Sequence, residues 1–413
     1  MNIKVSQLAN AIRFLSIDAV QKANSGHPGM PMGMADVATV LFKFHLRFNP
    51  KNPSWINRDR FILSAGHGSM LLYSLLYLTG YEKVKLDDIK NFRQLDSICA
   101  GHPEYLCNSG IETTTGPLGQ GLANSVGLAI AAEIYKKKFN SKIINNKTYV
   151  IASDGDLMEG ISHESMSLAG HLKLKNLIVF FDNNKISIDG STSLSVSDNY
   201  KKRFESYGWN FIEINGHNEK QIDKAIKKAH KSNKPTLISC KTIIGFGSPN
   251  KSGKSSSHGS PLGEEEIKLV RKKLKWPHLP FEIPDEVLKA WRQIGAKGET
   301  VEKNWLNELN KSKENIKENF NQLNNKIFRD KLNDLVNLEK EKYYKDKPAM
   351  ATRQCSMKVI EALNNLMPNL VGGSADLSGS NNTKTSNSVI FNSKNYGGNY
   401  IHFGVREHGM AAA

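Results

Sequence analysis

The chain has 413 residues, of which 39% are hydrophobic and 23% are charged, and its formal charge is +16 at pH 7. This length is enough for two or three domains, and no apolar run approaches the roughly 20 residues that a membrane-spanning helix needs. The first 20 residues include Arg13 and Asp18, which interrupt the apolar segment of a secretion signal. We expect a globular, cytoplasmic protein with no membrane partner.

The positive charge does not indicate a nucleic-acid partner. Only 11 of the 56 basic residues are arginine, the residue preferred for bidentate contacts, and no nucleic-acid-binding motif accompanies the lysines. The four cysteines include no Cys-x-x-Cys pair, which argues against a zinc cage and a disulfide scaffold. Basic charge on solvated faces suits small phosphorylated substrates instead.

Helices and strands are predicted to alternate along the first 240 residues. Apolar residues at helical spacing predict helices over 3–24 and 33–47, and Arg60–Ser64 predicts a buried strand. Further strands are predicted at 147–152, 177–181, 209–214 and 235–240, and helices near 158–172, 198–207 and 218–231. This alternation predicts an α/β fold, a doubly wound parallel sheet with helices on both faces. Such sheets bind ligands at the carboxyl ends of their strands.

The remainder of the chain changes in composition. Residues 245–263 are rich in Gly, Ser and Pro, which predicts a long surface loop or a flexible linker. A helix is predicted over 352–366, and strands at 370–371 and 400–403. We expect an α/β domain over 1–298, a Lys/Glu/Asn-rich helical connector over 299–347, and the incomplete start of a second α/β domain over 348–413.

Oxygen-bearing side chains follow two of the predicted strands. Asp154-Gly155 comes after the strand at 147–152, and Asn184 comes after the next strand. A carboxylate and a carboxamide at neighbouring strand ends can converge with a backbone carbonyl on Mg²⁺ or Ca²⁺. The same residues are common in turns, so the pattern alone leaves both interpretations open.

Glycine and histidine motifs fall in the predicted loops. Gly116-Pro-Leu-Gly-Gln-Gly121 precedes an apolar helix and could bring backbone amides close to a phosphate, although Gly-Pro pairs often mark only a turn. Four histidines, His27, His67, His102 and His258, stand beside glycine or proline. Together they could hydrogen-bond a polyhydroxylated substrate and move protons near neutral pH.

Taken together, these motifs resemble transketolase, a thiamine-diphosphate enzyme family. The motifs that carry the resemblance are Ser25-Gly-His-Pro-Gly29, Ala65-Gly-His-Gly68, Gly101-His-Pro-Glu104, Gly116-Pro-Leu-Gly-Gln-Gly121, Asp154-Gly155 with Glu159-Gly-Ile161, Asn184-Lys-Ile-Ser-Ile-Asp-Gly190, His258-Gly259, Ala351-Thr-Arg353, Gly373-Ser-Ala-Asp376 and Gly404-Val-Arg-Glu-His408. They occur in the family's order from about residue 5 to the last residue. The resemblance implies the thiamine-diphosphate-binding fold, followed by the opening of a pyrimidine-binding domain.

The resemblance also implies a role for each matched residue. Mg²⁺, Ca²⁺ or another divalent cation would be held by Asp154, Asn184 and the Ile186 carbonyl. The residues expected at thiamine diphosphate are His67, Gly116, Leu118, Gly155, Asn184, His258, Asp376 and Glu407. The residues expected to bind the sugar are His27, His102, His258, Arg353 and Ser380. Catalysis is expected from Glu407, His258, His27 and His102.

The implied activity is transfer of a two-carbon ketol unit from a ketose phosphate to an aldose phosphate in the pentose phosphate pathway. The implied full-length enzyme is a homodimer with active sites between subunits. Two alternatives stay open: a related enzyme such as dihydroxyacetone synthase, or a catalytically inactive fragment. We expect residues 1–413 alone to be inactive. One departure from the family is Ser153 in place of glycine, which matters only if its φ is positive.

Overall fold

The computed structural model describes residues 3–321, 327–367 and 369–413 and divides into two compact units. The first unit comprises Met1–Ala129, Asn146–Asn304 and Ala412–Ala413, and the second comprises Ile130–Asn145 and Trp305–Ala411. No helix among the described residues is long and apolar enough to cross a membrane. The division into domains predicted above stays a prediction.

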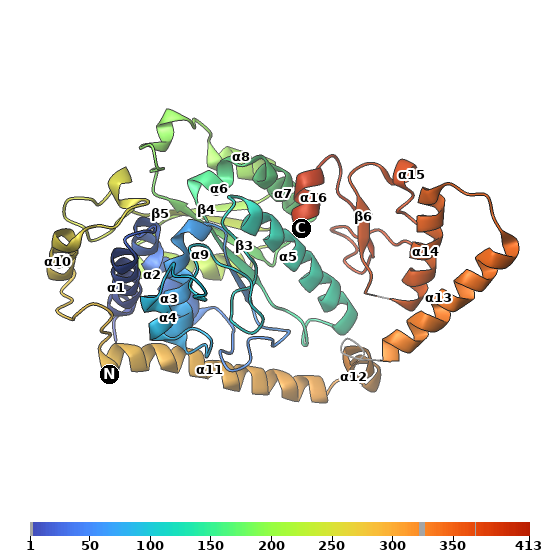
Figure 1. Cartoon of the computed structure of the whole chain (residues 1–413), viewed down its shortest axis with the longest axis horizontal. Helices are drawn as coiled ribbons and strands as arrows, with labels where there is room; N and C mark the ends of the chain where they lie inside the picture. The colour runs from blue at the N-terminus through green and yellow to red at the C-terminus, as the bar shows by residue number, and fades with distance from the viewer. Residues whose placement is uncertain (1–2, 322–326, 368) are drawn as a thin grey trace. The chain divides into compact units, whose positions relative to one another are not determined.

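The first unit is built on a parallel sheet (Figure 1). Its strands are β1 (Arg60–Leu63), β2 (Thr148–Ala152), β3 (Leu177–Asn183), β4 (Asn210–Asn215) and β5 (Thr236–Lys241). Their order across the sheet is β1-β2-β3-β5-β4, and every neighbouring pair is parallel. All of these strands lie where the alternation of apolar and turn-forming residues predicted them, so the predicted fold class is confirmed.

Helices cover both faces of this sheet (Figure 1). The helices from the N-terminus to Asn310 are α1 (Val5–Ala23), α2 (Gly29–Phe44), α3 (Ser69–Thr79), α4 (Leu86–Lys90), α5 (Gln120–Phe139), α6 (Asp154–Met158), α7 (Gly160–His171), α8 (Tyr200–Ser206), α9 (Glu219–His230), α10 (Glu264–Lys273) and α11 (Asp285–Asn310). Alternate strand residues such as Tyr149, Ile151 and Phe180 pack in one core with α1, α2, α3 and α9. Helices α5, α7 and α8 lie over the opposite face.

Local sequence explains why α9 forms and which side it buries. The Asn218 side chain accepts a hydrogen bond from the Gln221 amide and caps the first turn. Buried apolar residues then recur at helical spacing, at Ile222, Ala225, Ile226 and Ala229. The helix therefore begins at a polar cap and turns one apolar stripe toward the sheet.

The Gly/Ser/Pro-rich segment 245–263 is an ordered loop rather than a flexible linker, and it lies only partly at the surface. Ser248 and Ser257 are fully buried. The Ser248 hydroxyl donates to Glu266, and the Gly253 amide donates to the Ile244 carbonyl at 2.8 Å. Composition predicted a loop correctly, although a short 3-10 helix, Ser255–Ser257, lies within it, and these polar contacts hold the loop in place.

The second unit contains helices and a two-stranded parallel ladder among its described residues. Its elements are α12 (Glu314–Asn321), α13 (Ile327–Asp346), α14 (Thr352–Leu366), β6 (Gly372–Ser374), α15 (Ser378–Asn381), β7 (Tyr400–His402) and α16 (Glu407–Ala412). Strand β6 begins at Gly372, after the predicted 370–371, because its first paired residue is Gly372, opposite Tyr400. The next pair is Gly373 with Ile401. A Cβ at Gly373 would lie 2.5 Å from the Ile401 carbonyl oxygen, so glycine permits the close approach of β7.

Candidate active site

Most of the predicted site residues of the first unit lie in segments that follow strands of the sheet. His67 follows β1, Asp154 follows β2, and Asn184 follows β3. The ordered loop after β5 carries His258. Because these strands are parallel, their carboxyl ends meet at one edge of the sheet, where α/β proteins bind ligands.

Asp154 is the first residue of α6 and has an unpaired buried oxygen. Its Oδ2 atom has no hydrogen-bond partner among the described residues. Burial, and next the charge of Asp182, raises the pKa of Asp154 to about 7. The preceding Ser153 has φ −103°, so its departure from the family glycine causes no strain. A bound cation would satisfy the unpaired oxygen and offset the charge, so this carboxylate fits a metal ligand.

The amide of Asn184 is held in one orientation. Its Nδ2 donates to Asp182 Oδ2 at 2.9 Å, and its Oδ1 accepts from the Ile186 amide at 2.9 Å. Lys185, between them, has φ +62°, which turns the chain sharply at this point. Asp182 is fully buried and also accepts a hydrogen bond from Thr242. The carboxamide oxygen is thus placed by a buried hydrogen-bond chain before any ligand arrives.

Glycines let three loops approach one another at the same edge. A Cβ at Gly66 would lie 2.8 Å from the Gly116 amide nitrogen. Gly116 has φ +147°, and a Cβ there would lie 3.2 Å from His102 Cγ. A Cβ at Gly155 would lie 2.8 Å from a Leu118 methyl carbon. The absence of side chains at these glycines therefore lets the loops pack closely and brings the predicted cofactor-binding residues Gly116, Leu118 and Gly155 near one another.

Asp156, which the sequence analysis did not single out, joins these loops. Its carboxylate accepts hydrogen bonds from Ser64 Oγ at 2.7 Å, the Gly119 amide at 2.9 Å and the Ser153 amide at 2.8 Å. Ser64 Oγ in turn accepts from the Leu122 amide at 2.9 Å. The Ser153-x-x-Asp156 spacing matches a capping box and could have indicated this role, although not its long-range partners.

Three predicted histidines form a compact cluster. The ring centroids of His27 and His67 lie 5.2 Å apart, those of His67 and His258 5.2 Å, and those of His27 and His258 5.7 Å. The Nδ1 atoms of His27 and His258 are buried without a hydrogen-bond partner among the described residues. Burial, and next the charge of His258, lowers the pKa of His27 to about 4 and that of His67 to about 3. These imidazoles are neutral at pH 7.

The guanidinium of Arg93 is a second feature that the sequence analysis missed. Its Nη1 donates to Ser25 Oγ at 2.9 Å, and a Cβ at Gly101 would lie 3.3 Å from its Cζ. Arg93 therefore lies between the Ser25-Gly-His-Pro-Gly29 motif and the loop that carries His102. Its charge contributes, after burial, to the lowered pKa of His102. No local motif around Arg93 indicated this position.

Acid is expected to destabilise the ligand-free chain through the histidine cluster. His27 and His67 have folded-state pKa values of about 4 and about 3, below the ordinary 6.5. The unfolded chain therefore binds more protons below about pH 6.5, and stability is lost as the pH falls from there through about 4. Urea unfolding across this pH range should show that the free energy of unfolding falls less steeply in the His27→Gln/His67→Gln variant than in the parent. A variant of exposed His171 should lose stability with falling pH as the parent does. If the cluster variant and the parent lost stability equally steeply, this expectation would be wrong.

The other predicted site residues belong to the second unit and are exposed there. Arg353 lies in the first turn of α14, and Ser380 lies in α15. Asp376 has φ +63° in the turn after β6. Glu407 is the first residue of α16, which follows β7. All four side chains are therefore open to a ligand or a partner surface.

Comparison with known proteins identifies the family to which this chain is similar. The description "Transketolase, thiamine diphosphate binding domain" matches residues 4–332, and "Transketolase, pyrimidine binding domain" matches 348–413. A Rhodobacter capsulatus transketolase is 51% identical over 407 residues, which cover 98% of this chain and 61% of the relative. Transketolase 2 of Escherichia coli is 52% identical over 417 residues, with 98% and 62% covered.

Solved structures agree with the sequence comparison. The crystal structure of transketolase from Campylobacter jejuni is similar with a TM-score of 0.90 and 44% identity, covering 100% of this chain and 63% of that one. The chain thus spans about three fifths of the length of the relatives that it matches. Since the diphosphate-binding description covers most of the chain and the fold agrees throughout, the chain belongs to the transketolase family.

Proposed function

We propose that the protein transfers a two-carbon ketol unit from a ketose phosphate to an aldose phosphate, the transketolase reaction of the pentose phosphate pathway. The observation that carries this proposal is the cluster of His27, His67 and His258 in loops that follow or pack beside the carboxyl edge of the sheet. Neutral imidazoles with unpartnered nitrogens suit a ligand rich in hydroxyl groups.

The proposal includes thiamine diphosphate and a divalent cation. The unpaired Oδ2 of Asp154, the oriented carboxamide of Asn184 and the Ile186 carbonyl would supply hard oxygen ligands for the cation. In the first unit, we assign the contacts with the cofactor itself to His67, Gly116, Leu118, Gly155, Asn184 and His258. When bound, the cofactor would supply the carbon nucleophile that amino-acid side chains lack.

The histidines would bind and orient the sugar. His27 and His258 each present a buried Nδ1 without a partner among the described residues, and either atom could accept a proton or a hydroxyl hydrogen bond. His102 is exposed beside the Gly116 turn and would bind a further hydroxyl. Because burial lowers their pKa values, these imidazoles are bases in the neutral form at physiological pH.

The second unit would contribute the remaining contacts. Arg353 and Ser380 would hold the distal phosphate of the sugar by charge-assisted hydrogen bonds. Asp376 and Glu407 would lie at the cofactor, with the Glu407 carboxylate holding a proton at the aminopyrimidine ring nitrogen. The proposal places the enzyme in the cytoplasm as a homodimer, so that these exposed residues meet the cofactor across subunits.

The test is a two-substrate assay on the full-length protein. We expect formation of sedoheptulose 7-phosphate from xylulose 5-phosphate and ribose 5-phosphate, lost when either thiamine diphosphate or the divalent cation is withheld. Formaldehyde serves as the control acceptor, because a two-carbon ketol unit added to it gives dihydroxyacetone. Transfer to formaldehyde without transfer to ribose 5-phosphate would favour a dihydroxyacetone synthase, and no transfer to either would refute the proposal.

A further inference from the structure

His217 lies outside the proposed site but contacts the base of the loop that carries His258. It follows β4 and precedes α9. The Gly216 amide donates to the Lys241 carbonyl at 2.8 Å, and a Cβ at Gly216 would lie 2.6 Å from Thr242 Cγ2. Glycine therefore allows the turn after β4 to lie directly against the end of β5.

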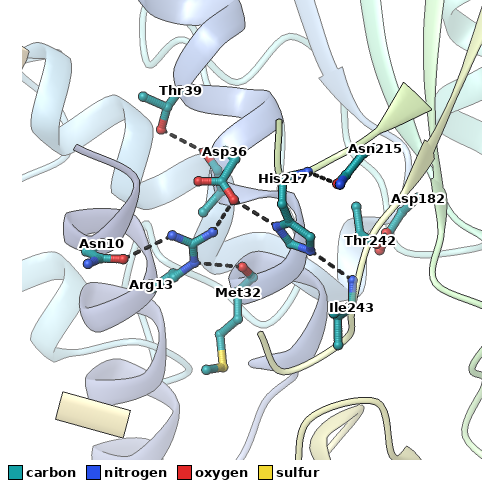
Figure 2. Close-up of polar contacts among 11 residues, drawn as sticks. Asn10, Arg13, Met32, Asp36, Thr39, Asp182, Asn215, His217, Thr242 and Ile243 are labelled. Carbon is teal, nitrogen blue, oxygen red and sulfur yellow. Dashed lines mark hydrogen bonds and ion pairs between the residues drawn. The ribbon is translucent and has the colours of Figure 1, made fainter. Parts of the chain in front are cut away.

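The hydrogen bonds of His217 define its tautomer (Figure 2). The Ile243 amide donates to His217 Nε2 at 3.1 Å. A backbone N–H cannot accept, so Nε2 must carry a lone pair and the ring proton must be on Nδ1. Nδ1 then donates to Asp36 Oδ2 at 2.9 Å. The bond to Ile243 exists only while His217 is a neutral imidazole.

Asp36 is held by a buried arginine. Arg13 Nη2 lies 2.6 Å from Asp36 Oδ2, and the exposed fractions of the two side chains are 2% and 11%. Arg13 also donates to the Met32 carbonyl at 2.9 Å and to Asn10 Oδ1 at 3.0 Å (Figure 2). The His217 ring is therefore oriented by a hydrogen-bond network that joins α1, α2 and the turn after β4.

Ring contacts hold the same backbone segment. The Phe246 ring stacks on His217 with centroids 4.1 Å apart and an interplanar angle of 22°. Arg13 Cζ lies 4.6 Å from the Phe246 ring centroid. Phe246 thus contacts both ends of the Arg13–Asp36–His217 network. It lies three residues after Ile243, whose amide donates a hydrogen bond to His217.

The segment fixed in this way positions His258 against His27. The Gly245 amide donates to the Gly29 carbonyl at 3.0 Å, two residues after His27. A Cβ at Gly29 would lie 2.4 Å from the carbonyl oxygen of Ser257, the residue before His258. The loops that carry the two histidines therefore touch through backbone atoms, and a shift at 243–246 would separate the rings.

We propose that His217 is a positioning residue, which pins residues 243–246 as a neutral hydrogen-bond acceptor and thereby sets the place of His258 in the site. The functional part of this inference rests on the proposed function, since it assigns His258 to the cofactor and the sugar. The structural part does not depend on it. The side chain of His217 contacts Asp36, Ile243 and Phe246, none of which is a predicted site residue.

The test compares two variants of the full-length protein. His217→Phe keeps a ring to stack on Phe246 but has no acceptor, whereas His217→Gln keeps an acceptor for the Ile243 amide. For the Phe variant we expect amide exchange over 243–258 to be about tenfold faster and thiamine diphosphate to bind about tenfold more weakly. The Gln variant should be within about threefold of the parent in both measurements. Unchanged exchange or affinity in the Phe variant, or no rescue by Gln, would overturn the proposal.

A matched control and a second measurement separate the outcomes. His45 forms a similar pair with Asp223, at 3.0 Å, away from this loop, so His45→Phe should leave exchange over 243–258 unchanged. If the Phe variant does not fold, nitrogen NMR of the parent decides the proposal: a protonated Nε2 on His217 overturns it, and a proton on Nδ1 supports it. Absence of transferase activity in the parent would refute the proposed function alone, because exchange and NMR do not need activity.

Discussion

Replacing Asp154 by alanine is expected to weaken cation-dependent binding of thiamine diphosphate by at least about 100-fold, because the substitution removes the only carboxylate among the proposed metal ligands. The variant would then lack the carboxylate that holds a cation to offset the charge of the diphosphate. Isothermal titration of the cofactor, with and without Mg²⁺, measures the effect. Adding a chelator to the parent protein should weaken binding of thiamine diphosphate to a similar extent.

The same variant should fold normally, which separates loss of a ligand from loss of structure. In the ligand-free chain, Asp154 Oδ2 is buried without a partner among the described residues, and the raised pKa of Asp154 means that burial and the charge of Asp182 outweigh the favourable contacts of Lys185 and Tyr200 with this carboxylate. We expect the free energy of unfolding of Asp154→Ala to be within about 1 kcal/mol of the parent or above it. Asp223→Ala, on α9, serves as the control for binding. Cofactor binding that is undiminished in Asp154→Ala would remove this residue from the metal site.

Replacing Glu407 by glutamine is expected to lower turnover by about 100-fold or more while cofactor affinity changes by less than about tenfold. Glutamine has nearly the same shape but cannot hold a proton at the ring nitrogen of the aminopyrimidine. Glu407 is exposed at the start of α16, so the substitution leaves no buried group unpaired and the fold should persist. Steady-state kinetics of the full-length protein, with cofactor titration alongside, separates the two effects.

His408 provides the control for this second substitution. It is the next residue of α16, is exposed, and has no assigned role in the reaction. His408→Asn should therefore retain turnover within about threefold of the parent, as expected of an exposed residue with no assigned role in the reaction. Near-normal turnover in Glu407→Gln, or an equal loss in both variants, would show that the carboxylate is not the proton carrier.

Local pattern determined much of this protein. Alternating apolar runs and turn residues were sufficient to place β1 to β5 and helices α7, α8 and α9, because burial on both faces of a parallel sheet imposes that pattern on the chain itself. The motifs around His27, His67, Asp154 and Asn184 could also be read directly. Each depends on a few consecutive residues, at a strand end for His67, Asp154 and Asn184 and between α1 and α2 for His27.

Contacts between residues far apart in the sequence could not be predicted from local sequence patterns. Asp36 and His217 are 181 positions apart, and no local signal connects them, yet their hydrogen bond orients the base of the His258 loop. Asp156 and Arg93 likewise acquire their partners only when separate loops meet. The physical reason is that a hydrogen bond depends on distance in space, whereas sequence patterns report only neighbours along the chain. The sequence by itself therefore determined the sheet and the residues that we predict to act at its edge, and the tertiary structure decided how these residues are held in position.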